Sequence, residues 1–272
     1  MYPSRKMIKT KLKFWYSSKK INNWIKENNI FFILAIGRSG TNFLSQLLNK
    51  SKNAYIVHEP VRSDFRAYKE AFSSERKADK YFKTFRKKEI YLRAKLKNKE
   101  IYGEVNSVIR RHCKAIKKSF PNASIFHLVR DGRDVIRSMM ARKTMTSEDP
   151  NTKNIRPTEE NPWYDKWASM NRFEKLCWYW DVENRYLHEN FDTIIYFEKL
   201  ISDYEYFNKK LLVPLNLKIP KEIWEKEVKS PKNITKHHTI PHWKDWDPKK
   251  LESFNKICGE TMKNLGYEIL FK

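Results

Sequence analysis

Residues 30–36 form a run of seven apolar residues that ends at Gly37, and a short polar loop with a second glycine, Gly40, follows. Apolar residues then recur at helical spacing over 43–48. This order predicts a buried strand, a tight loop and a helix, so that the backbone N–H groups of the loop and the helix N-terminus converge. Such a point binds phosphate or sulfate. The sequence therefore predicts an α/β fold with an anion site at the end of its first strand.

The loop lacks one residue that ATP- and GTP-binding loops contain. Their motif, G-x-x-x-x-G-K-[ST], places a lysine directly after the second glycine, whereas Thr41 follows Gly40 here. A phosphotransferase or nucleotide-binding enzyme built on a P-loop-like fold stays open as an alternative. It is disfavoured because no acidic partner for magnesium stands out in the sequence.

Strands and helices alternate along the rest of the chain. Further strands are predicted at 54–58, 101–106, 124–129 and 193–197, and helices at 62–100, 108–119, after Gly132, at about 168–190 and up to about 265–267. The alternation predicts a P-loop-like three-layer fold, with a central, mostly parallel sheet flanked by helices. We expect a basic N-terminal leader, 1–29, and a single domain, 30–272, with a helical insertion at about 62–100 and a loop at 142–166.

The formal net charge of +24 over 272 residues favours anionic partners such as polyanionic glycans, membrane surfaces or phosphorylated substrates. AT-rich codons are an alternative source of the many lysines. A basic nucleic-acid-binding protein is a further alternative, but no recognised binding motif supports it, and it leaves the anion loop unexplained. We therefore expect no specific binding of nucleic acid.

The cysteines, Cys113, Cys177 and Cys258, are not spaced like metal ligands or like a disulfide framework, which favours a reducing compartment. No apolar run approaches the roughly 18 residues of a membrane span, and the lysine-rich start lacks the apolar segment of a secretory signal. We expect a cytoplasmic protein. The basic, aromatic-containing leader is interpreted either as an amphipathic helix that packs on the domain or touches a membrane peripherally, or as a plain solvated segment.

A second strand–turn–helix segment supplies another candidate anion site. The strand at 124–129 runs into Arg130, Gly132 marks a turn, and Ser138 lies about two turns into the next helix. Ligands of open α/β sheets sit outside the carboxyl ends of the strands. A guanidinium and a hydroxyl there can hold a phosphate dianion by charge-assisted hydrogen bonds. Together with the first loop, they predict a ligand with two separated phosphate ends.

These residues resemble the sulfotransferases that use 3′-phosphoadenosine 5′-phosphosulfate (PAPS). Residues 37–43 are similar to their 5′-phosphosulfate loop, and residues 126–138 to their 3′-phosphate segment. The likeness is closest to the carbohydrate branch, in which an R-S-G loop is followed by Q-L-x-N and then by a strand that ends in an E-P turn. Those motifs stand here at 38–40, 46–49 and 55–60.

The resemblance implies how each matched residue takes part. Backbone amides of residues 39–42 and the side chains of Ser39, Thr41 and Asn42 would hold the phosphosulfate, while Arg130 and Ser138 would hold the 3′-phosphate. Arg38 would offset the negative charge that develops as the S–O bond breaks. No metal is needed. The donor-binding residues are thus expected to be Gly37, Arg38, Ser39, Gly40, Thr41, Asn42, Phe43, Arg130 and Ser138.

Sulfuryl transfer to a hydroxyl also needs a general base, and the resemblance points to Glu59, at the end of the strand 54–58. The alternative is that Glu59 caps a turn before Pro60. Strand alternation predicts that His58 points to the opposite face, as a packing or orienting residue. Glu104 is the second candidate base, because residues 102–107 resemble a G-E-K-x-P element of related bacterial enzymes. Valine and serine replace its lysine and proline.

The predicted reaction transfers a sulfuryl group from PAPS to the hydroxyl of an acceptor, which we expect to be a carbohydrate or a glycolipid. Lys236, His237 and His238 are expected to close over the donor or to form a solvated loop. An aromatic group at 163–167 would stack on a sugar or, more commonly for such residues, pack in the core. The sequence predicts no oligomeric state.

Overall fold

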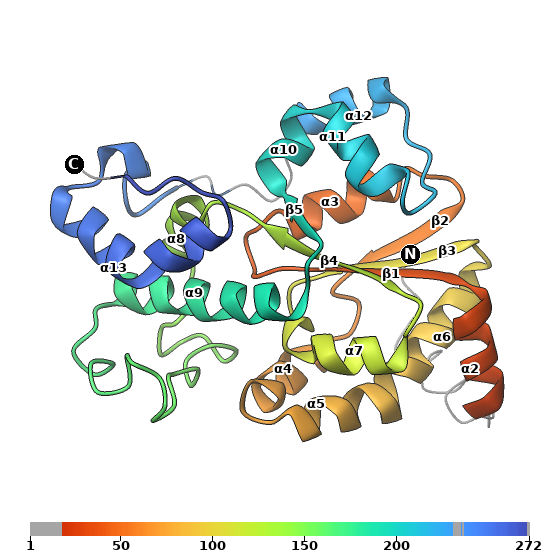
Figure 1. The fold of residues 1–272 in the computed structure, drawn as a ribbon, viewed down its shortest axis with the longest axis horizontal. Helices are drawn as coiled ribbons and strands as arrows, with labels where there is room; N and C mark the ends of the chain where they lie inside the picture. Colours follow the sequence, from red (N-terminus) through yellow and green to blue (C-terminus); the bar gives the residue numbers. More distant parts are fainter. Residues whose placement is uncertain (1–17, 231–234, 236, 271–272) are drawn as a thin grey trace.

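The computed structural model describes residues 18–230, 235 and 237–270. Its centre is a parallel sheet of five strands in the order β2-β3-β1-β4-β5, with helices on both faces (Figure 1). The strands are β1 (Asn29–Leu34), β2 (Ala54–His58), β3 (Ile101–Asn106), β4 (Ser124–Val129) and β5 (Ile194–Tyr196). The predicted three-layer α/β fold is confirmed.

The strands β1 and β3 are buried on both faces. In β1 this burial accounts for the apolar run, whereas β3 also contains the polar residues Glu104 and Asn106. In β1, Phe31 and Ile33 pack into the apolar cluster on one face, and Phe32 and Leu34 into the cluster on the other. Ile33 pairs with Val105 of β3 on one side and with Phe126 of β4 on the other. The carboxyl ends of β1, β3 and β4 therefore emerge side by side.

Three groups of helices surround the sheet. One face carries α3 (Thr41–Leu48), α10 (Phe197–Ser202), α11 (Tyr204–Phe207), the π-helical turn η3 (Asn208–Leu212) and α12 (Lys221–Val228). The other carries α2 (Ser18–Glu27), α4 (Asp64–Ser73), α5 (Glu75–Tyr81), the π-helical turn η1 (Phe82–Arg86), α6 (Lys87–Lys97), the 3-10 turn η2 (Arg110–His112) and α7 (Cys113–Ser119). The third group, beyond the end of β4, contains α8 (Gly132–Met140), α9 (Arg172–Asn190), the 3-10 turn η4 (Trp243–Asp245) and α13 (Pro248–Asn264).

Several boundaries differ from the sequence-based expectation. The first strand ends at Leu34, although Ala35 and Ile36 stay fully buried. Helix α9 begins at Arg172 and not at about 168, because Asn171 and Glu174 form a reciprocal capping box there. The stretch 62–100 is helical, as expected, but is divided among α4, α5, η1 and α6.

The apolar face of α2 packs on the domain. Ile21, Trp24 and Ile25 are buried, and the rings of Trp24 and Tyr91 of α6 meet edge to face at 5.3 Å. Of the three alternatives for the leader, packing on the domain is the one that α2 adopts, while residues 1–17 lie outside the described part of the chain. Over the described residues, no helix combines the length and the apolar character that crossing a bilayer requires.

A buried charge cluster joins the stretch 62–100 to the sheet. The guanidinium of Arg86 has no exposed surface and pairs with Glu104 of β3 at 2.6 Å, with Asp64 at 3.1 Å and with Glu89. Burial raises the pKa of Asp64 to about 7; Arg86 opposes this rise, and the neighbouring Glu104 and Glu89 add to it. The carboxyl groups outnumber the guanidiniums here, so protonation of Asp64 relieves the excess of negative charge.

The raised pKa of Asp64 gives the stability a defined pH dependence. The folded pKa lies above the unfolded value of 3.8, so the folded state binds more protons between about pH 4 and 7 and loses stability as the pH rises through this window. Replacing Asp64 with Asn should remove this loss, and the stability of D64N relative to the native protein should rise by at most about 1.4 kcal/mol per pH unit. Urea unfolding from pH 4 to 8 measures this, and a flat difference would contradict it.

Candidate functional site

The loop after β1 has an unusual backbone. Arg38 and Gly40 both adopt left-handed φ angles, of 72° and 89°. A Cβ atom on Gly40 would lie 2.1 Å from Cε2 of Phe197, so this position requires glycine for both conformation and space. Helix α3 begins immediately afterwards, and no side chain among the described residues caps its first N–H groups. These groups are left to bind an anion.

A cavity of about 550 Å³ lies at the carboxyl edge of the sheet. Its walls include both segments that the sequence singled out, together with Glu59. Of the predicted donor-binding residues, Gly37, Arg38, Gly40, Thr41, Asn42, Phe43, Arg130 and Ser138 line it. Ser39 does not: its side chain is fully buried, and its hydroxyl has no hydrogen-bond partner among the described residues. For Ser39, the backbone N–H is the group left for the predicted contact.

The two segments that the sequence predicts to bind anions touch each other directly. Nε of Arg38 donates to Oγ of Ser138 at 2.9 Å, and Nη1 of Arg130 donates to the backbone carbonyl of Arg38 at 3.1 Å. Thr235 adds a second hydroxyl, 3.3 Å from Nη2 of Arg38 and 2.9 Å from Oγ of Ser138. Burial, Arg142 and Arg130 lower the pKa of Arg38. This crowding of cations favours an anionic ligand.

The predicted base, Glu59, lies in the wall of this cavity, with a left-handed φ of 43°. Ser107, just after β3, donates to Oε1 of Glu59 through both its hydroxyl and its backbone N–H, the latter at 3.4 Å. Nε2 of His58 lies 3.5 Å from the same oxygen. This side of the cavity therefore presents a carboxylate held through one oxygen.

His58 also lines the cavity, so the expectation that it points to the opposite face is wrong. The strand ends at His58, and the left-handed residue that follows ends the alternation of side chains. Nε2 of His58 lies 3.0 Å from Oγ1 of Thr41, and this contact joins the turn that carries Glu59 to the start of α3. Burial lowers the pKa of His58, although Glu59 opposes this change.

The second candidate base, Glu104, lies outside the cavity wall. It is fully buried, accepts two hydrogen bonds from Arg86, at 2.9 and 2.6 Å, and accepts one from the hydroxyl of Tyr102. The structure thus brings Glu59 to the cavity and uses Glu104 in the buried charge cluster. The contact of Ser107 with Glu59 was not predicted from the sequence. Its one signal in the sequence was that a serine stands at 107, where the related G-E-K-x-P element has a proline.

The other candidate side chains divide between the cavity and the core. His238 lines the cavity, His237 is exposed, and Lys236 lies outside the described residues. Trp163 and Trp167 pack on the third helix group, with the rings of Trp167 and Trp178 4.9 Å apart, whereas Tyr164 is exposed. Within the described part of the chain, no three His, Cys, Asp or Glu side chains gather as a metal site would require.

Comparison with known proteins shows where this architecture recurs. Residues 90–221 match a model of the sulfotransferase family. A search of curated proteins gave no match. The fold is similar to a sulfotransferase from Alicyclobacillus acidocaldarius (12% identity, 89% of this chain and 96% of that one covered, TM-score 0.50). It is also similar to sulfotransferase STF9 from Mycobacterium avium (11% identity, 93% and 83% covered, TM-score 0.52) and to the sulfotransferase domain of the curacin biosynthetic pathway (13%, 89% and 99%, TM-score 0.50). At these identities the likeness shows a shared fold.

The packing of Gly40 against Phe197 generates a stability test. G40A should be destabilised by about 1–2 kcal/mol from the left-handed backbone alone, and further by the contact with the ring. The matched control is G259A in α13, where a Cβ atom meets no atom within 4 Å, and there alanine should leave stability unchanged or raise it by up to about 1 kcal/mol. Urea unfolding measures both, and equal stabilities would disprove the packing argument.

Proposed function

We propose that this protein is a PAPS-dependent sulfotransferase that transfers a sulfuryl group to a hydroxyl of a carbohydrate or glycolipid. One observation carries the proposal: the two segments that resemble the donor-binding motifs line a single cavity and are joined there by the hydrogen bond from Arg38 to Ser138. The sulfotransferase-family match over residues 90–221 supports sulfuryl transfer independently of the first loop, which lies outside it.

The cavity suits a nucleotide with anionic groups at two positions. Its volume of about 550 Å³ falls in the range of small-molecule sites. Arg130 and Ser138 are the groups for the 3′-phosphate, and the backbone of residues 37–43 is the cradle for the phosphosulfate. Phe197, Ile201 and Val228 give the same cavity an apolar wall, against which a planar base can pack.

The proposed reaction forms a bond from the acceptor oxygen to sulfur and breaks the bond from sulfur to the 5′-phosphate oxygen. Glu59 takes the proton of the acceptor hydroxyl, since it is the carboxylate of the cavity wall whose anchoring contacts all fall on one oxygen, Oε1. Arg38 offsets the charge that develops on the leaving phosphate. The acceptor class rests on the likeness of residues 38–40, 46–49 and 55–60 to the carbohydrate branch.

Nucleotide binding tests the donor assignment. 3′-Phosphoadenosine 5′-phosphate (PAP) should bind more tightly than AMP, and magnesium should change neither affinity. R130A should raise the Kd of PAP by about 10- to 100-fold, the equivalent of one charge-assisted hydrogen bond, and leave the Kd of AMP unchanged. Isothermal titration calorimetry measures all four constants. If PAP and AMP bind equally to the native protein, Arg130 and Ser138 do not hold a 3′-phosphate.

Turnover tests the chemistry. With ³⁵S-labelled PAPS, the native protein should label a chitin oligosaccharide or galactosylceramide faster than 4-nitrophenol. E59Q should lower kcat by about 10²- to 10⁴-fold with little change in the Kd of PAP, because it removes the base but not the donor site. R38A should also abolish turnover, with a smaller loss of PAP affinity. Faster labelling of 4-nitrophenol would refute the carbohydrate assignment, and full activity of E59Q would refute the base.

A further inference from the structure

Glu59, which follows β2, is held by Ser107, which follows β3. Its hydrogen bonds and ion contact among the described residues all fall on Oε1, which receives the hydroxyl and the backbone N–H of Ser107 and lies near Nε2 of His58. None of these contacts involves Oε2. A carboxylate fixed in this way keeps one oxygen in place and presents the other to the cavity that both residues line.

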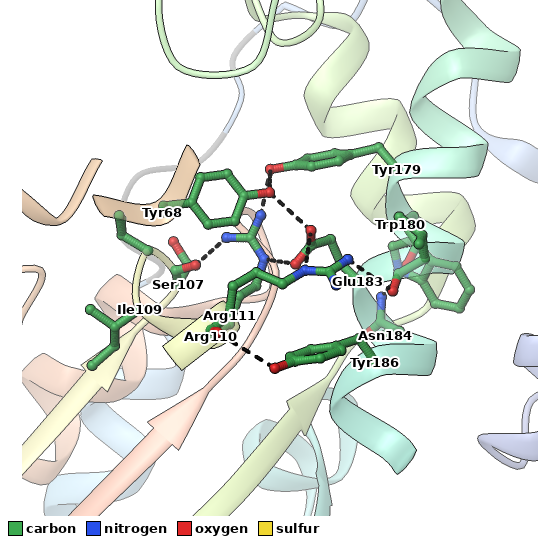
Figure 2. Close-up of polar contacts among 12 residues, drawn as sticks. Tyr68, Ser107, Ile109, Arg110, Arg111, Tyr179, Trp180, Glu183, Asn184 and Tyr186 are labelled. Atoms are coloured by element: carbon green, nitrogen blue, oxygen red, sulfur yellow. Dashed lines mark hydrogen bonds and ion pairs between the residues drawn. The ribbon is translucent and has the colours of Figure 1, made fainter. Parts of the chain in front are cut away.

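Ser107 is itself fixed from behind by Arg110, as Figure 2 shows. Nη1 of Arg110 donates to the carbonyl oxygen of Ser107, Nε to Oε2 of Glu183, and Nη2 to the hydroxyl of Tyr179. The guanidinium also lies 4.2 Å from the ring centre of Tyr68. Because Arg110 is only 3% exposed and all three of its nitrogens are engaged, its position is set by α4 and α9.

The groups around Arg110 carry charges that hold its guanidinium in place. Burial opposes ionisation of Glu183, but Arg110 and Arg111 outweigh it and lower the pKa of that carboxyl. Burial raises the pKa of Tyr68 and Tyr179, so both phenols keep their protons. None of the three residues of α4 and α9 that surround Arg110, namely Tyr68, Tyr179 and Glu183, lines the cavity. The contact of Arg110 with the cavity wall runs through Ser107.

We propose that Ser107 is a positioning residue for the Glu59 carboxylate and that Arg110 acts on Glu59 through Ser107. This inference rests on the proposed function, because it assigns Glu59 as the base. The turn between them is short and doubly fixed: Oδ1 of Asn106 accepts from the backbone N–H of Val108 at 2.8 Å and of Ile109 at 3.2 Å. The path from Glu183 to Glu59 therefore runs through side chains and one turn that have little freedom to rearrange.

A double-mutant cycle separates positioning from a structural effect. S107A should lower kcat about 10- to 100-fold, with the KM for PAPS changed less than about twofold, because a small misplacement of a reacting group costs this much. In the E59Q background the same substitution should change kcat less than about twofold, since the base it positions is gone. The acceptor is whichever of the three compounds above is labelled fastest. Additive losses would overturn the assignment of Ser107.

Arg110 has a matched control in its neighbour. Arg111 also pairs with Glu183, at 3.0 Å, and is stacked between Phe72 and Tyr186, but it makes no contact with Ser107 in the described structure. R110K should lower kcat about tenfold, whereas R111K should leave kcat within about twofold at a comparable loss of stability. Equal losses of kcat in the two variants would overturn the part assigned to Arg110.

Hydrogen–deuterium exchange of the backbone amides tests the positioning of Glu59 without any measurement of turnover. Segment 57–61 should exchange faster in S107A and R110K than in the native protein, and at the native rate in R111K. If the native protein labels no acceptor but exchange follows this pattern, the proposed function fails and the positioning of Glu59 stands. If the native protein is active and segment 57–61 exchanges alike in all variants, the proposed function stands and the positioning is wrong.

Discussion

The parallel pairing of β1 with β3 on one side and β4 on the other is the constraint from which the candidate site follows. It sets the carboxyl ends of these strands side by side, and β2 extends the row through its pairing with β3. A residue of the cavity wall follows the end of each of these strands: Gly37 after β1, Glu59 after β2, Ser107 after β3 and Arg130 after β4. The apolar contacts of the strands thus determine where Gly37, Ser107, Arg130 and Glu59 stand in the cavity wall.

The parts of the structure that the sequence predicted well are those that local patterns determine. The bounds predicted for β2, β3 and β4 agree with the structure, because short stretches rich in Ile, Val, Phe and Tyr are typical of strands. Gly40 was identified because a tight loop between strand and helix needs a residue free to adopt a left-handed conformation. The fold class predicted that the segments after β1 and β4 share one edge of the sheet, but the direct hydrogen bond from Arg38 to Ser138 was not predicted.

The parts that the sequence could not supply depend on contacts between distant residues. The orientation of His58 was predicted wrongly because alternation holds only while the strand lasts, and the left-handed Glu59 ends it. The link from Ser107 to Arg110 and Glu183 joins residues 73 positions apart. Nothing in their local patterns distinguishes them from ordinary surface charges, and only the packing of α9 beneath the turn reveals them.

The fully buried Arg86 carries a consequence for how this protein can diversify. Because its guanidinium joins Asp64 and Glu89, of the stretch 62–100, to Glu104 in the sheet, this stretch is not an appendage that can be exchanged as a unit. Loss of the stretch would leave the buried carboxylate of Glu104 without its partner Arg86, at a cost on the order of 3–5 kcal/mol. A substitution at an exposed position of the stretch avoids this cost, whereas removal of the whole stretch does not.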